Sequence, residues 1–337
     1  MSILHVGIDV SRKNLDVATG HGEAQPVYLG KFTNDQAGFE QLAQALQSAM
    51  QNLGTTPIHL TIEPTGGYEQ LLARFAIAQG WRVSLPNPLL VRDWARAEGR
   101  RSKTDRQDAL LLARYGARAH PPEWCPLPAS VEQLEALLLR REDLQAMLRQ
   151  EQNRQLALQA RDAYQGPVAQ SLDASIATIT AALSQIEQAI NNQLDQHPDL
   201  KQQTKWLRQV PGIGKKNVLF VLVLLHRWGT LTQMTGSSKG LTAYVGLDPV
   251  AFTSGTSVYK RSGISRKGNK TVRHFLYLGA LGGVRGHNAL CVFYQRLLAR
   301  GKAKKLALVA AARKILVWAW AVFRNQTPFD HALSYAR

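Results

Sequence analysis

The sequence contains little cysteine. Cys125 and Cys291 are the only two cysteines in 337 residues, and they lie far apart in the chain. Two isolated cysteines provide neither the clustered ligands of a structural zinc site nor a disulfide framework. The sequence therefore predicts a protein of a reducing compartment, the cytoplasm.

Two kinds of hydrophobic segment are also absent. The first residues, MSILHVGIDVS, lack the basic start and the small-residue cleavage site of a secretory signal. The apolar runs at 218–225 and 306–323 are too short for a bilayer span or are interrupted by Arg313 and Lys314. We expect both runs to be buried helices of a globular protein with no membrane partner.

Acidic residues are scarce in the last 138 positions. Residues 200–337 contain 23 Lys and Arg but only two acids, Asp248 and Asp330. Because the whole chain has 41 basic and 24 acidic residues, the first 199 positions hold 18 basic and 22 acidic ones. An imbalance this large exceeds what solubility requires and is typical of a surface that binds a phosphate backbone. The C-terminal part is therefore predicted to bind nucleic acid, whereas the N-terminal part keeps its acids for another purpose.

The first hundred residues alternate between strand and helix patterns. Residues 3–33 contain three short apolar runs separated by turn residues, and a helical spacing follows over 35–50. Two further strands are predicted at 58–64 and 81–87, with a helix at 68–78 between them. The order βββαβαβ is that of an α/β ribonuclease H-like fold with a mixed sheet.

Residues 131–193 are rich in Leu, Gln, Ala and Glu, which favours long helices. Gly166-Pro167 is predicted to interrupt them. An apolar seam with steps of three and four runs along the second half, through Ile176, Ile179, Leu183, Ile186 and Ile190. We interpret the region as an antiparallel helical hairpin or a two-stranded coiled coil, whose seam packs either within one chain or between chains.

These patterns divide the chain into three predicted domains. Residues 1–122 form the acidic nuclease-like domain, 123–200 the helical hairpin or coiled coil, and 201–337 a basic, mainly α domain. In the last domain a hairpin of strands is expected around 250–265, and the closing helix at 304–324 is expected to be buried.

Four carboxylates carry the predicted chemistry of the N-terminal domain. Asp9 ends the first predicted strand, Glu63 ends the fourth, and Asp105 and Asp108 share one face of a later helix. If the two strands are neighbours, the four side chains converge, and clustered carboxylates are normally held together by a hard divalent cation. We predict Mg²⁺, with Mn²⁺ as a substitute, in a site for phosphoryl transfer. The alternative is that each acid is a turn or cap residue.

Six segments in order carry a family resemblance: GIDVSRKNLDV, IEPTGGY, KTDRQDALLLA, VPGIG, the GL-P…SG run and ISRKGN…R…LY. Over nearly its whole length the chain resembles the DEDD insertion-sequence transposases related to the Piv DNA invertase. The resemblance implies a RuvC-like domain with Asp9, Glu63, Asp105 and Asp108 as its acids. It also implies a transposase domain with a serine nucleophile and, for many relatives, guidance by a non-coding bridge RNA.

The resemblance places the nucleophile in the SG pair, at Ser254. The sequence reads SGTS, so Ser257 is the rival position. A serine nucleophile needs neighbouring donors that stabilise charge on the phosphate, and the surrounding cations supply them. G-x-S-x-G is absent and no nearby His or Asp forms a hydrolase triad, which argues against esterase or protease chemistry.

Ten further residues are predicted to contact nucleic acid. Gly212 and Gly214 let the backbone approach a phosphate at the start of a helix, and Lys215 and Lys216 add charge, as in a helix-hairpin-helix element. The alternative is an ordinary tight turn. The remaining predicted contacts follow the serine motif: Lys260, Arg261, Arg266, Lys267, Lys270 and Arg273.

Three hypotheses of function follow. The first is an insertion-sequence transposase that cuts and rejoins double-stranded DNA through a serine nucleophile and a Mg²⁺-dependent acidic site. Paired DNA ends then require a homo-oligomer, a dimer or tetramer. The second is a structure-selective nuclease of the Holliday-junction-resolvase type, without a covalent intermediate. The third is a non-enzymatic architectural protein that binds nucleic acid.

Overall fold

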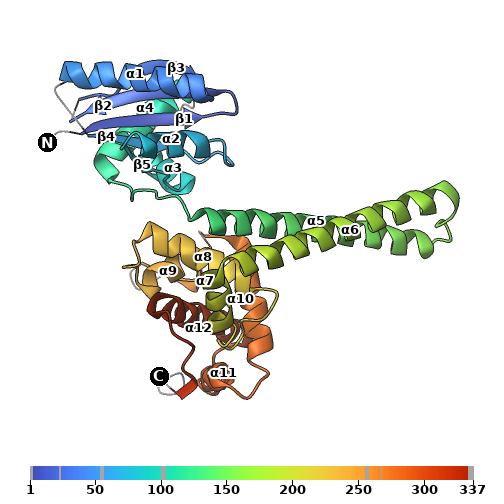
Figure 1. The fold of residues 1–337 in the computed structure, drawn as a ribbon. Coiled ribbons are helices and arrows are strands. Elements are labelled where there is room, and N and C mark those ends of the chain that lie inside the picture. Colours follow the sequence, from blue (N-terminus) through green and yellow to red (C-terminus); the bar gives the residue numbers. More distant parts are fainter. Residues whose placement is uncertain are drawn as a thin grey trace. The chain divides into compact units, whose positions relative to one another are not determined.

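The protein is described by a computed structural model that covers residues 3–22, 24–53, 57–99, 104–254, 258–266 and 268–332. The backbone alone is described at 52–53, 251–254 and 258–262. The chain forms two compact units, 1–126 and 127–337 (Figure 1).

A five-stranded mixed sheet forms the centre of the first unit. Its strands are β1 (Leu4–Val10), β2 (Asn14–His21), β3 (Val27–Thr33), β4 (Ile58–Ile62) and β5 (Arg82–Ser84), in the spatial order β3-β2-β1-β4-β5. The first three strands are antiparallel to one another, whereas β4 runs parallel to β1 and β5 parallel to β4. The predicted mixed sheet and the predicted order of its elements are therefore confirmed.

One face of this sheet is apolar. Leu4, Val6 and Ile8 of β1 are fully buried, and they share a core with apolar residues of α1 (Gln36–Leu53) and α2 (Gln70–Ala78). The alternation along β1 sends its other residues, His5, Gly7 and Asp9, to the opposite face.

The opposite face is covered by α4 (Asp105–Ala119), which follows α3 (Pro88–Ala97). Small residues permit a close approach, since Ala18 of β2 packs with Ala109 and Ala113 of α4. Gly7 makes the approach closer still, because a Cβ at this position would lie 2.1 Å from the backbone of α4. The helix that carries two of the predicted acids is thus pressed against the strand that carries Asp9.

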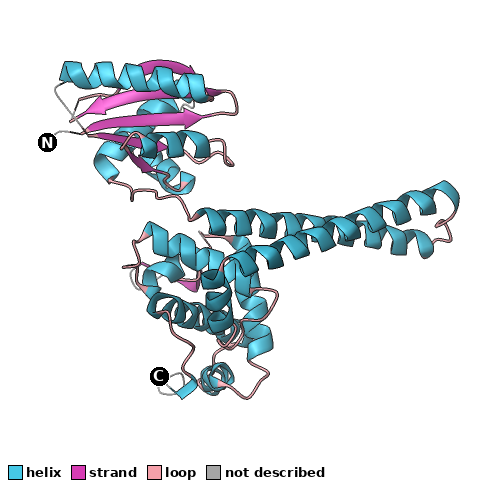
Figure 2. Ribbon diagram, in the orientation of Figure 1, coloured by secondary structure: helices cyan, strands magenta, loops and turns pink. Residues whose placement is uncertain are grey.

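The second unit begins with two long helices, α5 (Ala129–Gln159) and α6 (Gly166–Gln196), which lie side by side as an antiparallel hairpin (Figures 1 and 2). The predicted hairpin is confirmed. The break between the two helices lies at 160–165, directly before Gly166-Pro167, as predicted; proline occupies the first turn of α6, where its missing N–H has no partner to lose. In the predicted seam, Ile179 and Ile190 are buried.

The remaining elements of the second unit are mostly short helices: α7 (Pro198–Leu207), α8 (Val218–Leu231), α9 (Ser238–Val245), α10 (Lys270–Gly283), α11 (Ala289–Ala299) and α12 (Lys304–Asn325). The predicted strand hairpin is present as β6 (Pro249–Ser254) and β7 (Val258–Ile264). The second unit is therefore mainly α, as the composition indicates.

The core of the second unit is built around α8 and α12 and extends into the base of the hairpin. Leu134 and Leu138 of α5 and Ile190 of α6 belong to the same cluster of buried side chains as Leu222 and Leu316. Among the described helices, α12 alone has the length and composition of a membrane span. Its apolar residues lie in this core, as expected from the sequence.

Candidate active site and nucleic-acid interface

Asp9 and Glu63 occupy equivalent places on neighbouring parallel strands. Ile8 of β1 is in register with Ile62 of β4, and each acid follows directly. The pairing continues past the strand end, because the Glu63 N–H donates to the carbonyl oxygen of Ile8 over 3.3 Å. The adjacency on which the sequence interpretation depended is therefore present.

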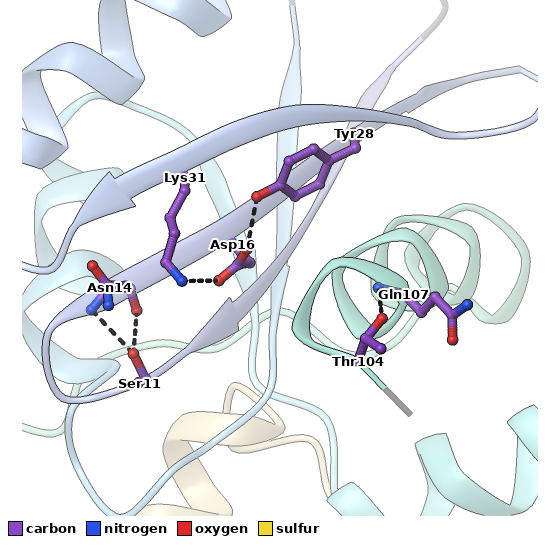
Figure 3. Close-up of polar contacts among 7 residues, drawn as sticks. All are labelled: Ser11, Asn14, Asp16, Tyr28, Lys31, Thr104 and Gln107. Atoms are coloured by element: carbon purple, nitrogen blue, oxygen red, sulfur yellow. Dashed lines mark hydrogen bonds and ion pairs between the residues drawn. The ribbon is translucent and has the colours of Figure 1, made fainter. Parts of the chain in front are cut away.

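Asp105 and Asp108 both lie in the first turn of α4. The turn is capped by Thr104, whose hydroxyl oxygen accepts a hydrogen bond from the Gln107 N–H at 3.3 Å (Figure 3). Acids in a first turn also interact favourably with the helix dipole. Their position therefore has a structural benefit besides any chemical role.

The pKa of Asp9 reflects the charges of the other three acids. The pKa of Asp9 is raised to about 6, and burial is the largest cause. The negative charges of Asp108, Asp105 and Glu63 raise it further, in decreasing order of effect, and Asp16 has the smallest effect. Acids from two strands and one helix thus act on a single carboxyl group. Proton binding to Asp9 relieves this repulsion, and a cation bound among the acids would relieve it as well.

The donor set fits a hard divalent cation, because all four side chains offer carboxylate oxygens. As the side chains stand, no three His, Cys, Asp or Glu residues of the described part of the chain are close enough to hold one metal ion. Glu63 also has a basic neighbour, with its Oε1 3.9 Å from Nη2 of Arg92 on α3. Binding an ion therefore requires side-chain adjustments around Asp9.

A fifth acid, Asp16, lies beside this group and was missed by the sequence interpretation. Asp16 on β2 is directly opposite Asp9 in the antiparallel register. Its Oδ1 accepts a hydrogen bond from the Tyr28 hydroxyl at 2.7 Å, and its Oδ2 is 3.6 Å from Nζ of Lys31 (Figure 3). The signal was available in the sequence: a tight turn at Arg12-Lys13 places residues 9 and 16 at equal distances from its centre.

The loop after Glu63 is tied to the end of β1 by a buried acid. Glu69 is 4% exposed, and its Oε2 accepts hydrogen bonds from the N–H groups of Thr65 (3.0 Å) and Gly67 (3.1 Å). The Thr65 hydroxyl donates to the carbonyl oxygen of Val10 at 3.0 Å. These contacts give the residues of the IEPTGGYE segment a structural role. Glu69 fixes the conformation of the loop, and the loop holds Glu63 next to the strand of Asp9.

The two serines proposed as nucleophile belong to the β6–β7 hairpin. Ser254 is the last residue of β6 and pairs with Val258, whereas Ser257 lies outside the described residues. Ser265, in the same motif, has a structural role, since its hydroxyl donates to a carboxylate oxygen of Asp248.

The predicted helix-hairpin-helix turn lies between α7 and α8. Its glycines differ in role: Gly212 has φ +92° and packs so closely that a Cβ would lie 2.4 Å from Cδ1 of Ile315, whereas Gly214 faces open space. Buried Asn217 closes the turn, accepting from the Gly214 N–H (2.7 Å) and donating to the Gly212 carbonyl oxygen (3.0 Å). The Gly214 N–H is therefore already bonded, and exposed Lys215 and Lys216 are the groups that face solvent.

The remaining residues predicted to contact nucleic acid differ in their exposure and in their contacts within the fold. Arg266 and Lys270 are exposed. Arg273 is engaged within the fold, because its guanidinium donates to the carbonyl oxygens of Val245 (2.9 Å) and Gly268 (2.6 Å). The side chains of Lys260 and Arg261, and the whole of Lys267, lie outside the described residues.

A further basic group at the turn between α11 and α12 did not feature in the sequence interpretation. Its members are all exposed: Arg296, Arg300, Lys302, Lys304 and Lys305. They follow one another within ten positions, with no acid between them. The basic character of the second unit therefore extends beyond the serine motif.

Comparison with known families identifies the class of protein. A transposase profile, that of the DEDD transposases of IS110 type, matches residues 6–159, and the profile of the transposase IS116/IS110/IS902 family matches residues 204–295. The chain belongs to the IS110 family of transposases. It is therefore an enzyme that acts on DNA.

Individual relatives agree with this assignment. The chain is 36% identical to the pilin gene-inverting proteins of Moraxella lacunata and Moraxella bovis over 332 residues, which is 98% of either chain in both comparisons. It is 28% identical to an uncharacterized 43.6 kDa protein of insertion element IS110 from Streptomyces coelicolor over 163 residues, 48% of this chain and 38% of that one.

Proposed function

We propose that the protein is the transposase of an insertion sequence, a site-specific recombinase that cuts and rejoins DNA through a serine nucleophile and a divalent-metal site. One observation supports this best: Asp105 and Asp108 of α4 and Glu63, which follows β4, all act electrostatically on the carboxyl group of Asp9 in β1. The order and pairing of the strands agree with a ribonuclease H-like, RuvC-like domain, the type of fold in which acids gather at one sheet edge.

In the proposed reaction the hydroxyl oxygen of Ser254 bonds to the phosphorus of a DNA phosphodiester, and the bond from phosphorus to a sugar oxygen breaks. The serine proton is lost and the sugar oxygen gains one, so the strand end is held as a phosphoserine ester. Attack by a second sugar hydroxyl on this ester rejoins the DNA and releases the serine. Asp9, Glu63, Asp105 and Asp108 would hold Mg²⁺ or Mn²⁺, and the bound ion would supply positive charge to stabilise the reacting oxygens.

The proposed partners follow from the same scheme. Double-stranded DNA would lie along cations of the second unit, including Lys215, Lys216, Arg266 and Lys270. A bridge RNA would select the DNA sites, as the family resemblance implies, and a dimer or tetramer in the cytoplasm would bring two DNA ends together.

Trapping the covalent protein–DNA intermediate tests whether Ser254 is the nucleophile. The full chain is incubated with donor DNA and Mg²⁺ and quenched in denaturant, and protein-linked DNA is measured for the wild type, Ser254→Ala and Ser257→Ala. We expect an adduct that only Ser254→Ala abolishes. Loss in Ser257→Ala alone would move the nucleophile to that position, and cleavage without any adduct would favour the resolvase-type nuclease.

Isosteric neutralisation tests the acids. Asp9→Asn, Glu63→Gln, Asp105→Asn and Asp108→Asn should each lower recombination by orders of magnitude, because a misplaced metal costs several kcal/mol of transition-state stabilisation. Mg²⁺ should raise the melting temperature of the wild type more than that of any variant. Equal stabilisation of all five proteins with near-normal recombination would show that these acids are turn and cap residues.

A further inference from the structure

Asp16 is the acid closest in register to Asp9, yet it is held differently. The two residues are directly opposite on antiparallel strands, so their side chains project from the same face of the sheet. The Asp16 side chain is 11% exposed, and both of its oxygens already have partners, one in the Tyr28 hydroxyl and the other in the Lys31 ammonium. The Asp16 side chain is therefore fixed in place by these two contacts.

Such an arrangement costs stability by itself, because like charges directly opposite on neighbouring strands repel. The surrounding side chains offset that cost. Lys31 provides a positive charge, and Tyr28 is held in turn by Arg106, whose guanidinium carbon lies 5.0 Å from the centre of the tyrosine ring. Arg106 belongs to the first turn of α4, between Asp105 and Asp108. One chain of contacts thus connects Asp16 with the helix that carries two of the candidate metal ligands.

An asparagine at this position would keep the hydrogen bond from Tyr28, although it would lose the ion pair with Lys31. Its side-chain oxygen accepts from the Tyr28 hydroxyl as a carboxylate does, without repelling Asp9. What asparagine lacks is the charge. The charge of Asp16 therefore has two neighbours: the Lys31 ammonium, 3.6 Å from its Oδ2, and the carboxyl group of Asp9, directly opposite in the register.

We propose that Asp16 is a positioning residue for the divalent cation: its fixed negative charge, one strand away from Asp9, strengthens cation binding by the four candidate ligands without itself ligating the ion. The inference rests on the metal-dependent function proposed above. Over a strand spacing of about 5 Å, attraction between one carboxylate and a divalent ion in a water-like dielectric corresponds to about tenfold in affinity.

Metal-dependent thermal stability of the full chain, measured without DNA, tests this. Melting temperatures are recorded against Mg²⁺ and Mn²⁺ concentration for the wild type, Asp16→Asn and the control Asp35→Asn. Asp35 belongs to the same unit and its carboxylate likewise accepts a hydrogen bond, from the Gly38 N–H at 2.9 Å, but it is not among the acids that act on Asp9. We expect about tenfold weaker metal binding in Asp16→Asn alone.

A second variant shifts the affinity in the opposite direction and does not depend on the folding of Asp16→Asn. Lys31, about half exposed, partly cancels the charge of Asp16. Lys31→Met should therefore bind the metal a few-fold more tightly. Unchanged affinity in both Asp16→Asn and Lys31→Met would overturn the inference and leave Asp16 as a partner of Tyr28. A wild type that no divalent metal stabilises would overturn the proposed metal site, and the inference with it.

Discussion

Gly7 of β1 lies directly beneath Ala109 of α4, so closely that a Cβ on residue 7 would come within 2.1 Å of the Ala109 carbonyl oxygen. The atoms that this Cβ would contact belong to the backbone of a helix, and they cannot move aside by a side-chain rotation. The distance between β1 and α4 therefore depends on the absence of one methyl group. Because Asp9 follows two residues later and Asp105 begins the helix, the same contact positions the acids.

Gly7→Ala is expected to displace α4 and to lower the unfolding free energy by about 1–3 kcal/mol, the usual cost of overpacking. Recombination and metal-induced stabilisation should fall as well, because Asp105 and Asp108 move with the helix. Urea denaturation with and without Mg²⁺ measures both effects. Gly20→Ala on β2 is the matched control, since its Cβ would meet only Pro26 at an ordinary 3.5 Å. Equal stability of the two variants would contradict the close packing.

Acid should destabilise the first unit through two buried histidines. His5 and His59 lie on neighbouring strands with ring centres 5.6 Å apart. Burial first, and then nearby positive charge, lower the pKa of each to about 4. The unfolded chain therefore binds protons more readily, and stability is lost as the pH falls from about 6.5 towards 4, by about 2 kcal/mol per histidine at pH 4.5.

His59→Gln keeps a donor for the Ser84 hydroxyl, with which the His59 Nε2 pairs at 2.8 Å, but cannot gain a proton. Its unfolding free energy should decline less than that of the wild type between pH 7 and 4.5. The exposed His274 provides the control, His274→Gln. Asp9, whose pKa is raised, contributes stability as the pH falls, which is opposite to the effect of the histidines. Because Asp9 is present in all three proteins, its contribution cancels in the comparison. Parallel pH curves for all three proteins would show that the buried pair does not oppose protonation.

Asn217→Ala should destabilise the second unit, because it leaves the Gly214 N–H and the Gly212 carbonyl oxygen without their side-chain partner. We expect a loss of about 2 kcal/mol in unfolding free energy. Exposed Lys216→Ala provides the contrast: unchanged stability, but weaker DNA binding and a salt slope reduced by about one. Denaturation and DNA titrations at several salt concentrations separate the two roles. A stable Asn217→Ala protein would mean that the turn holds its shape without this side chain.

The base of the hairpin should be indispensable for the C-terminal part of the chain. Leu134, Leu138 and Ile190 pack in the core of the second unit. Each contributes about 1.5–3 kcal/mol on burial, and their joint loss approaches the total stability of a domain. We expect a fragment 127–337 to unfold cooperatively in urea and a fragment 201–337 to show no cooperative transition. Similar transitions for both fragments would contradict this.

Much of the sheet and its acids was predictable because the signals are local. Alternating apolar residues determine which face of β1 is buried, and turn residues separate the first three strands. The placement of Asp9 and Glu63 needed one additional assumption, that their strands are neighbours, and the pairing of Ile8 with Ile62 confirms it.

Asp16 was missed because its importance lies in the register rather than in a motif. The register follows from the turn, where the Ser11 hydroxyl donates to the Asn14 carbonyl oxygen at 2.9 Å and accepts from the Asn14 N–H at 3.0 Å (Figure 3). Counting outward from this turn pairs residue 9 with residue 16. The close contact of Gly7 with α4 was not predictable in this way, since it joins segments a hundred residues apart.

The antiparallel course of α5 and α6 has a practical consequence. Each helix has 31 residues, a length of about 46 Å at 1.5 Å per residue. Because the chain enters and leaves this arm at the same end, its far tip at 160–165 is the place where added sequence strains neither connection. A fluorescent label or affinity tag inserted there would lie at the tip of the hairpin. A fluorescent label would report changes in the environment of the tip during DNA exchange. Equal excisions from both helices would shorten the arm and leave its attachment to the core intact.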